Sequence, residues 1–312
     1  MKKGYLYIIF STILFSTMEV SLKIFSTDFN PIQMNFLRFM VGSIILIPLA
    51  LKGIKARNVA LEKKDYLFFA LAGFICIVVS MVLYQMAIQY APASTVAVLF
   101  SCNPVFVVLL AHFMLGEKIY RHTIISIFFS MAGILVIISP FHVSERFTGI
   151  VLTILATITF ALYAVVGRSC SKKYGGLVFT CFSFIFGSVE MLTLILLTNI
   201  TSIAELIMRS GFNTFAYVPV FSGIDLHSIL SLIYVGIFVT GLGYTFYFMA
   251  MEVTSTEAAS LVFYIKPVLA PILAFIILGE AITYTKTIGI LLIVVGSLIT
   301  ILEKRFKRIR GI

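Results

Sequence analysis

Five charged residues interrupt apolar stretches that are long enough to cross a membrane: Glu19, Lys23, Arg38, Glu190 and Lys266. A charge in a membrane interior is costly, so such residues usually pair with one another or line the pathway of a solute. An acidic and a basic group that face one cavity can bind a polar solute and release it again. We therefore treat these five residues as the first candidates for solute binding.

Glu19, Lys23 and Arg38 lie on two consecutive apolar stretches. Glu19 precedes Lys23 by four residues, a spacing that places both on one face of a helix in the favourable order. Glu19 and Arg38 lie at similar estimated depths, which predicts an ion pair between them. The alternative to solute contact is a charge-compensated cluster that only holds two helices together. Glu190 is expected to be a second partner for Arg38 or a charge near the membrane interface.

Lys266 lies near the middle of its apolar stretch and directly precedes Pro267, and Asn103 precedes Pro104 in the same way. Proline removes a backbone donor and disturbs the carbonyl group one turn earlier, so both helices should bend near their centres. Bent helices would bring Lys266 and Asn103 to the midplane together, where they would contact substrate or act in gating. The alternative is that the prolines only shape packing, while Lys266 pairs with Glu19.

Among the tyrosines within the apolar stretches, four are candidates for solute binding: Tyr84, Tyr163, Tyr247 and Tyr264. A tyrosine offers a flat apolar face together with a hydroxyl group, which suits a cavity for an amphipathic solute. We therefore include all four among the candidate substrate-binding residues. Tyrosine is also common at membrane interfaces, so the alternative is packing or interface anchoring.

The composition indicates that the whole chain lies in a membrane. Of its 312 residues, 61% are hydrophobic and 12% are charged, with a mean hydropathy of +1.11. A soluble domain could not bury so much apolar surface, and lipid-exposed backbone must form its hydrogen bonds within a helix. We predict an all-α integral membrane protein with ten transmembrane helices near residues 4–26, 31–51, 66–88, 93–115, 121–139, 147–169, 176–198, 227–251, 256–278 and 284–302.

The two halves of the chain repeat each other. Residues 84–138 align without a gap with residues 247–301, an offset of 163, and the first hairpin repeats at an offset of 145. Matched positions include Phe15 and Phe160, Tyr84 and Tyr247, Phe100 and Phe263, and Leu115-Gly116-Glu117 and Leu278-Gly279-Glu280. Five spans per copy, an odd number, would invert one copy relative to the other, as in many secondary transporters. We predict two inverted five-helix repeats, residues 1–140 and 147–303.

The distribution of Lys and Arg predicts the orientation. One set of loops and termini carries 17 of these residues and the other set carries three, so both termini should be cytoplasmic. Residues 304–312 are expected to form a basic cytoplasmic tail at the headgroups of anionic lipids. The expected location is the cell (inner) membrane. Four scattered cysteines and four scattered histidines indicate neither disulfides nor a metal site.

These motifs resemble the drug/metabolite transporter superfamily, and within it the EamA-type carriers of bacteria. The resemblance covers essentially the whole chain. It rests on Asn103-Pro104 and Lys266-Pro267, each followed by Leu-Gly-Glu, and on residues 15–20 and 35–39. It implies a central cavity lined mainly by spans one, three, four, six, eight and nine, which would include Glu19, Asn103, Tyr163 and Lys266 and leave Arg38 peripheral. Many members of this family export amino acids or related metabolites, and others carry nucleotide sugars, lipid-linked sugars or drugs.

The sequence therefore predicts a secondary transporter that moves a small polar metabolite by alternating access. An amino acid or a related carboxylate or zwitterion is expected, and efflux is the expected direction. The alternatives are an intramembrane enzyme or flippase for a lipid-linked substrate, with Glu19 as a base, and a partner subunit that transports nothing. We expect a small-molecule substrate and the lipid bilayer as partners, no nucleic acid and no cofactor; a homo-oligomer stays open.

Overall fold

The computed structural model describes residues 2–27, 29–58, 60–116, 119–138, 147–254, 256–259 and 261–309, and within these ranges it contains helices but no β-strand. Labels with η denote 3-10 helices (η1, η3) and π-helices (η2, η4). The elements are α1 (Lys2–Ser16), α2 (Met18–Ile24), η1 (Phe25–Thr27), α3 (Pro31–Arg57), α4 (Lys63–Gly73), η2 (Phe74–Ser80), α5 (Met81–Tyr90), α6 (Ala93–Phe100), α7 (Asn103–Leu115), α8 (Arg121–Ile138), α9 (Phe147–Tyr174), α10 (Gly176–Thr198), α11 (Thr201–Arg209), η3 (Asn213–Phe215), α12 (Leu226–Ile233), η4 (Tyr234–Leu242), α13 (Gly243–Val253), α14 (Thr256–Ala259), α15 (Val262–Leu278) and α16 (Tyr284–Ile309).

The described chain has the length and apolarity of a multi-pass membrane protein. Seven helical stretches are long and apolar enough to cross a membrane: Lys3–Ile24, Pro31–Arg57, Lys63–Tyr90, Ala93–Leu115, Phe147–Arg168, Gly176–Thr198 and Ser228–Val253. Three more apolar helices are shorter: Thr123–Ile137, Val262–Leu278 and Tyr284–Gly296. All-helical architecture is therefore confirmed, whereas ten membrane crossings stay a prediction. Residues 304–309, expected in a tail, continue helix α16.

Two of the predicted spans are broken near their centres. The first is interrupted at Thr17, whose hydroxyl group bonds to the Leu14 carbonyl oxygen (2.8 Å) and to the Tyr234 hydroxyl group (2.8 Å). The fourth is interrupted by a turn at Ser101 and Cys102, directly before Asn103 and Pro104. Hydroxyl side chains compete for backbone groups, and proline cannot donate to the preceding turn, so both breaks have a local cause.

The two prolines behave differently. Pro104 lies in the first turn of α7, where its missing N–H group is tolerated, and the helix before it has already ended. Pro267 and Pro271 lie inside α15, which continues through both of them. We expected equivalent bends in both helices. Instead, the helix before Pro104 is interrupted between α6 and α7, whereas α15 continues as one helix.

Close glycine contacts join the two halves of the chain. A Cβ atom at Gly42 would lie 2.9 Å from the Gly236 carbonyl oxygen, and one at Gly187 would lie 2.7 Å from the Gly73 carbonyl oxygen. Small residues let helix backbones approach closely in membranes. The offset of 145 relates Gly42 to Gly187, and the offset of 163 relates Gly73 to Gly236. The sequence repeat therefore relates the Gly42–Gly236 contact to the Gly73–Gly187 contact.

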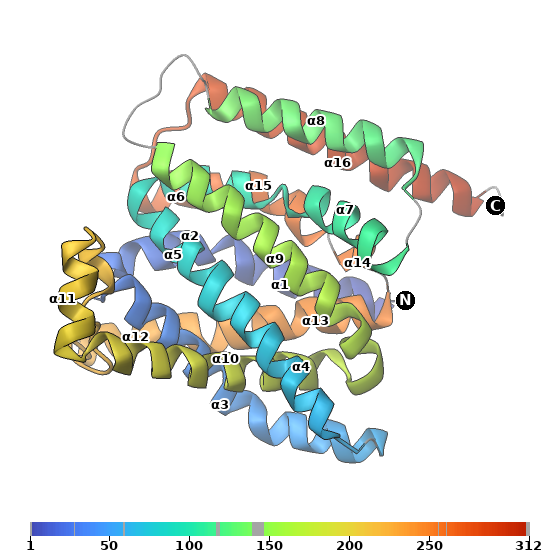
Figure 1. The fold of residues 1–312 in the computed structure, drawn as a ribbon. Helices are drawn as coiled ribbons and strands as arrows, with labels where there is room; N and C mark the ends of the chain where they lie inside the picture. Colours follow the sequence, from blue (N-terminus) through green and yellow to red (C-terminus); the bar gives the residue numbers. More distant parts are fainter. Residues whose placement is uncertain are drawn as a thin grey trace.

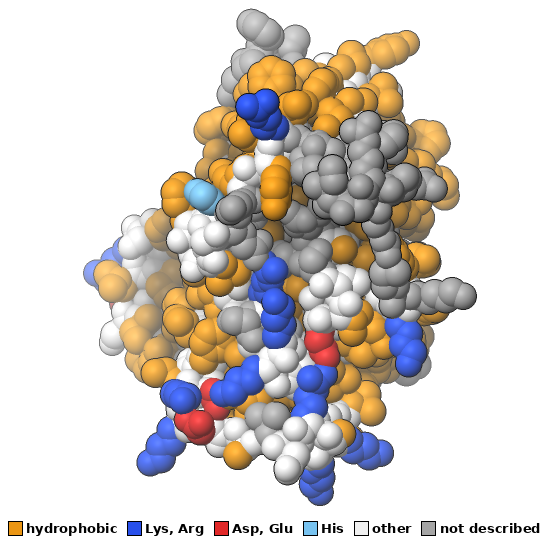
Figure 2. All heavy atoms as spheres, turned by 90° about the vertical axis from the view of Figure 1, so that its right-hand side faces the viewer, with side chains coloured by type: hydrophobic (Ala, Val, Ile, Leu, Met, Phe, Trp, Pro, Cys, Tyr) orange, Lys and Arg blue, Asp and Glu red, His pale blue; other side chains and the backbone are white. Residues whose placement is uncertain are grey.

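The bundle has two distinct ends. α8 and α16 pack along each other at its side, and α11 lies across one end (Figure 1). The other end, at the right of Figure 1, carries Lys and Arg side chains (Figure 2), and we call it the basic end. Its exposed cations include Lys3, Lys52, Lys55, Arg57, Lys63, Lys64, Arg121, Lys172 and Lys173. At the opposite end, Asn30 and Gln33 at the start of α3 donate hydrogen bonds to the carbonyl oxygens of Thr214 (3.0 Å) and Ser222 (2.7 Å).

Candidate functional site

A buried ion pair lies at the centre of the bundle. The Lys266 Nζ atom on α15 is 2.5 Å from the Glu19 Oε1 atom on α2, and both side chains have 0% exposure. The break at Thr17 places Glu19 in the first turn of a separate short helix, which packs against α5, α6 and α15. Burying two charges is offset only when their pairing and hydrogen bonding are nearly complete.

The hydrogen bonding of this pair is incomplete. The Tyr84 hydroxyl group donates a short hydrogen bond to Glu19 Oε1. Glu19 Oε2 has no hydrogen-bond partner among the described residues, and Lys266 Nζ contacts only the other carboxylate oxygen, which leaves donors of the ammonium group unused. The ammonium group lies 5.1 Å from the centroid of the Phe100 ring. The pair is therefore neutralised but retains binding capacity for another polar group.

The sequence repeat gives this group a neutral counterpart. We call Glu19, Tyr84 and Lys266 the charged half-site, and their repeat equivalents Ala164, Tyr247 and Asn103 the neutral half-site. All three neutral residues are completely buried. Asn103 Nδ2 donates to the Thr157 carbonyl oxygen (3.1 Å), whereas Asn103 Oδ1 and the Tyr247 hydroxyl group have no hydrogen-bond partner among the described residues.

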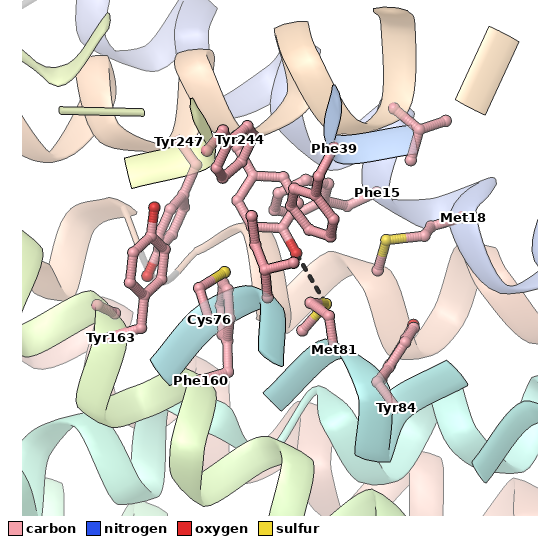
Figure 3. Close-up of a cluster of buried hydrophobic side chains, with 14 of the residues drawn as sticks. Phe15, Met18, Phe39, Cys76, Met81, Tyr84, Phe160, Tyr163, Tyr244 and Tyr247 are labelled. Carbon is pink, nitrogen blue, oxygen red and sulfur yellow. Dashed lines mark hydrogen bonds between the residues drawn. The ribbon is translucent and has the colours of Figure 1, made fainter. Parts of the chain in front are cut away.

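Aromatic rings lie between Tyr84 and Tyr247, the tyrosines of the two half-sites (Figure 3). Their pairing follows the repeat: the centroids of Tyr84 and Phe100 are 4.7 Å apart, and those of Tyr247 and Phe263 are 5.7 Å apart. Phe15 and Phe160 both lie against Tyr244, at 5.0 and 5.8 Å. The contacts around the centre are therefore closely similar in the two halves.

Tyr244 is the main residue of this region that the sequence did not predict. Its hydroxyl group donates to the Met81 sulfur atom (3.1 Å), the dashed contact of Figure 3, and the offset of 163 relates these two residues to each other. Repeat-related residues that touch each other lie where the two halves meet. A search for repeat-equivalent positions with a polar member could have found Tyr244.

The predicted ion pair between Glu19 and Arg38 is wrong. Among the described side chains, Glu19 forms its ion pair with Lys266, while Arg38 donates to Asn35 Oδ1 from Nε (3.3 Å) and from an Nη atom (3.0 Å). The Arg38 guanidinium carbon also lies 4.7 Å from the centroid of the Phe39 ring. Similar depth does not fix which helix faces meet, and here Glu19 and Arg38 face different partners.

The remaining candidates are dispersed. Lys23 Nζ donates to the Ile88 carbonyl oxygen (2.6 Å) instead of pairing with Glu19, and Glu190 is half-buried on α10. The Tyr163 hydroxyl group is 2.9 Å from Ser183 Oγ. Tyr264 is half-buried, whereas Tyr84, Tyr163 and Tyr247 are completely buried, so these three do not anchor at an interface.

The described residues contain no group of three or more His, Cys, Asp and Glu side chains that could hold a metal ion. The four cysteines are free thiols in buried positions. The chemistry available at the centre is therefore that of one carboxylate, one ammonium group, an amide and phenol hydroxyl groups. These groups can bind a polar solute by charge and hydrogen bonds.

Comparisons with known proteins agree with this architecture. A family model described as the EamA-like transporter family matches residues 2–139 and 147–302. An uncharacterized transporter of Clostridium kluyveri is 39% identical over 307 residues, which cover 96% of this chain and 93% of the relative. The protein PagO of Salmonella typhimurium is 25% identical over 291 residues, covering 92% of this chain and 89% of PagO.

A solved structure described only as the crystal structure of a protein has the same fold. Its TM-score is 0.68 at 18% sequence identity, and the alignment covers 98% of this chain and 99% of that one. The family match and the names of the relatives indicate a membrane transporter rather than an enzyme. The resemblance seen in the sequence is confirmed, and the chain belongs to the EamA-like transporter family.

Proposed function

We propose that this protein is a secondary transporter whose two inverted five-helix repeats move a small zwitterionic metabolite by alternating access. The single observation that carries the proposal is the completely buried Glu19–Lys266 pair with unused hydrogen-bonding capacity. It lies beside helix breaks at Thr17 and at Ser101–Cys102, and discontinuous helices at a central site are typical of transporters.

The pair favours a zwitterion over an ion of one sign. A substrate carboxylate can take the place of Glu19 at Lys266, while a substrate ammonium group takes the place of Lys266 at Glu19. One buried ion pair is then exchanged for two, and no charge is left uncompensated. An anion alone would leave Glu19 unpaired in a low-dielectric interior, which is strongly unfavourable. An α-amino acid carries the required ammonium and carboxylate groups on one carbon atom.

Alternating access is supported by the repeat-related contacts. The Gly42–Gly236 and Gly73–Gly187 contacts exchange under the sequence repeat, as do the aromatic pairs at the centre. Glu19 and Lys266 are closed to both ends of the bundle, since neither is exposed. Opening one end and then the other around this fixed pair would carry a solute across without a continuous pore.

Purified protein in sealed proteoliposomes tests the proposal. Loaded unlabelled amino acid should drive uptake of the same radiolabelled amino acid against its gradient by counterflow, and a panel of the protein amino acids identifies the best substrate. The recovered solute should be chemically unchanged; a modified product would favour the enzyme alternative. Uptake that does not saturate would indicate a channel, and no movement of any zwitterion would overturn the proposal.

We also propose that the protein lies in the inner membrane with the basic end in the cytoplasm, and that it exports its substrate. Single cysteines at Lys55 and Ser210, in a background without the four native cysteines, place the two ends. Both positions are exposed. In intact cells an impermeant thiol reagent should label Ser210→Cys and spare Lys55→Cys; the reverse pattern would invert the orientation.

A further inference from the structure

At the end of the bundle opposite the basic end, one carboxylate joins helix α6 to the connection between α15 and α16. Glu280, just beyond α15, accepts hydrogen bonds from the backbone N–H groups of Ala93 (2.7 Å) and Ser94 (3.0 Å) and from the Ser94 hydroxyl group (2.5 Å). Lys286 Nζ donates to the same Ser94 oxygen (2.8 Å). These contacts join the first turn of α6 to the α15–α16 connection, across nearly 190 residues of sequence.

The Leu-Gly-Glu motif explains how Glu280 reaches this position. Gly279 ends α15 with a left-handed backbone conformation (φ 66°), which residues other than glycine rarely adopt. The chain turns there and carries Glu280 toward α6. The first turn of α6 has no capping side chain of its own, so its free N–H groups and positive helix end are satisfied by Glu280 from the other repeat.

Helix α6 is short and is separated from the next helix by a break. It contains eight residues, and the break at Ser101–Cys102 separates it from α7. α6 and α15 pack against each other and against α2, the helix that carries Glu19. Separating the first turn of α6 from the end of α15 would therefore uncover the Glu19–Lys266 pair from this end.

We infer that Glu280 is the latch of the gate at this end, and that its release from Ala93 and Ser94 lets α6 swing on the Ser101–Cys102 break to admit or release the solute. This inference rests on the proposed transport function. The latch holds by charge-assisted hydrogen bonds to one helix end, so it is strong when formed and leaves solvated groups when open. It also assigns a task to the Leu-Gly-Glu motif, which substrate binding alone leaves unexplained.

Accessibility of a buried cysteine tests the latch without any substrate. Val96 on α6 is completely buried in the main core, so Val96→Cys, in a background without native cysteines, reports opening at this end. In purified protein, adding Glu280→Gln should speed its modification by a thiol reagent by about tenfold or more, because a charge-assisted bond is lost. Ser94→Ala, which removes one donor, should give a smaller increase.

Two controls keep the result specific. Glu205→Gln removes a carboxylate from an exposed ion pair with Arg209 and should leave the Val96→Cys rate unchanged. Val178→Cys, buried on α10 near the basic end, should stay unreactive when Glu280→Gln is added, whereas reactivity at both positions would mean general unfolding. In that case the double variant Ser94→Cys with Glu280→Cys decides: its cross-link should abolish counterflow and a reductant should restore it.

The outcomes separate the latch from the transport proposal. An unchanged Val96→Cys rate in folded Glu280→Gln protein overturns the latch, even where counterflow of a zwitterion is measured. Full counterflow in the cross-linked double variant overturns it as well. A faster rate together with no transport of any zwitterion supports the latch as the gate of this end and rejects the proposed substrate class.

Discussion

The two half-sites occupy equivalent positions of the same repeat, yet only one is charged. Tyr84 and Tyr247 are both completely buried against repeat-related phenylalanines, but Tyr84 donates to Glu19 while the Tyr247 hydroxyl group has no partner among the described residues. The difference arises because Ala164 stands where Glu19 stands in the other half. The packing around the tyrosines is similar in the two repeats, while the charged groups lie in only one of the two half-sites.

The same asymmetry holds for the second buried cation. Arg38 corresponds to Ser183, which contacts the Tyr163 hydroxyl group. Arg38 differs from Lys266 in its hydrogen bonding, because Arg38 forms two hydrogen bonds to Asn35, whereas the Glu19–Lys266 pair leaves hydrogen-bonding capacity unused. A buried cation with well-formed partners supports structure, whereas one with unused donors that faces broken helices is suited to exchange partners. Substitutions can test this distinction.

The largest effect is expected from Lys266→Gln. Removing one member of a buried ion pair leaves an uncompensated carboxylate, which costs about 3–5 kcal/mol of folding free energy. Adding Glu19→Gln should restore most of the thermal stability, measured by unfolding in detergent. The double variant should still bind a zwitterion about tenfold to over a hundredfold more weakly, since charge-assisted bonds are gone. Restored transport in the double variant would make the charged half-site purely structural.

Arg38→Met is expected to act on stability alone. Methionine fills part of the same apolar space, but the Asn35 amide oxygen loses its donor, at a cost of about 1–3 kcal/mol. Unfolding should occur at a lower temperature than in the parent protein. The affinity of the folded variant for its substrate should stay within about twofold of the parent, because the loss of one substrate hydrogen bond would lower the affinity about tenfold. A drop in affinity as large as that of the Glu19→Gln, Lys266→Gln double variant would place Arg38 in the binding site.

Tyr84→Phe removes the hydroxyl donor of the charged half-site. The lost hydrogen bond to a carboxylate corresponds to about 1.5–3 kcal/mol when measured by thermal unfolding. The phenyl ring should stay in place against Phe100, so packing changes little. Stability equal to that of the parent would show that the charged half-site gains nothing from this contact.

Tyr247→Phe is the matched control and the smallest effect. Its hydroxyl group has no hydrogen-bond partner among the described residues, so removing it should leave stability within about 1 kcal/mol or raise it slightly. If the substrate uses this hydroxyl group, affinity falls while stability does not. Equal destabilisation by Tyr84→Phe and Tyr247→Phe would contradict the functional difference between the half-sites.

Sequence reasoning found the charged residues and the helical architecture, but it expected Glu19 to pair with Arg38 and gave the Glu19–Lys266 pair only as an alternative. Hydropathy fixes which segments are apolar, and the repeat predicted that Lys266 and Asn103 are equivalent. It could not tell that Glu19 faces α15 rather than α3, because the rotation of each helix depends on packing across the bundle. The break at Thr17 changes that rotation, and one hydroxyl side chain in an apolar run gives little warning of it.

The sequence could not predict the contacts between distant segments either. Leu-Gly-Glu appeared as a repeated motif, and the left-handed Gly279 follows from known helix endings. The target of Glu280 did not, since Ala93 and Ser94 carry no mark that distinguishes them from other helix starts. Tyr244 was overlooked because its repeat equivalent is Met81, so comparing residue identities could not reveal that they touch.

The glycine contacts between the two halves leave no room for a methyl group at four positions: Gly42, Gly73, Gly187 and Gly236. At Gly42 and Gly187 the partner is backbone, which cannot rotate aside as a side chain can, so alanine must push two whole helices apart. Such a methyl group acts as a wedge whose effect on each end of the bundle depends on which contact it enters. Alanine at Gly42 and alanine at Gly187 thus form a pair of tools for trapping opposite conformations, useful for crystallisation and for raising state-specific antibodies.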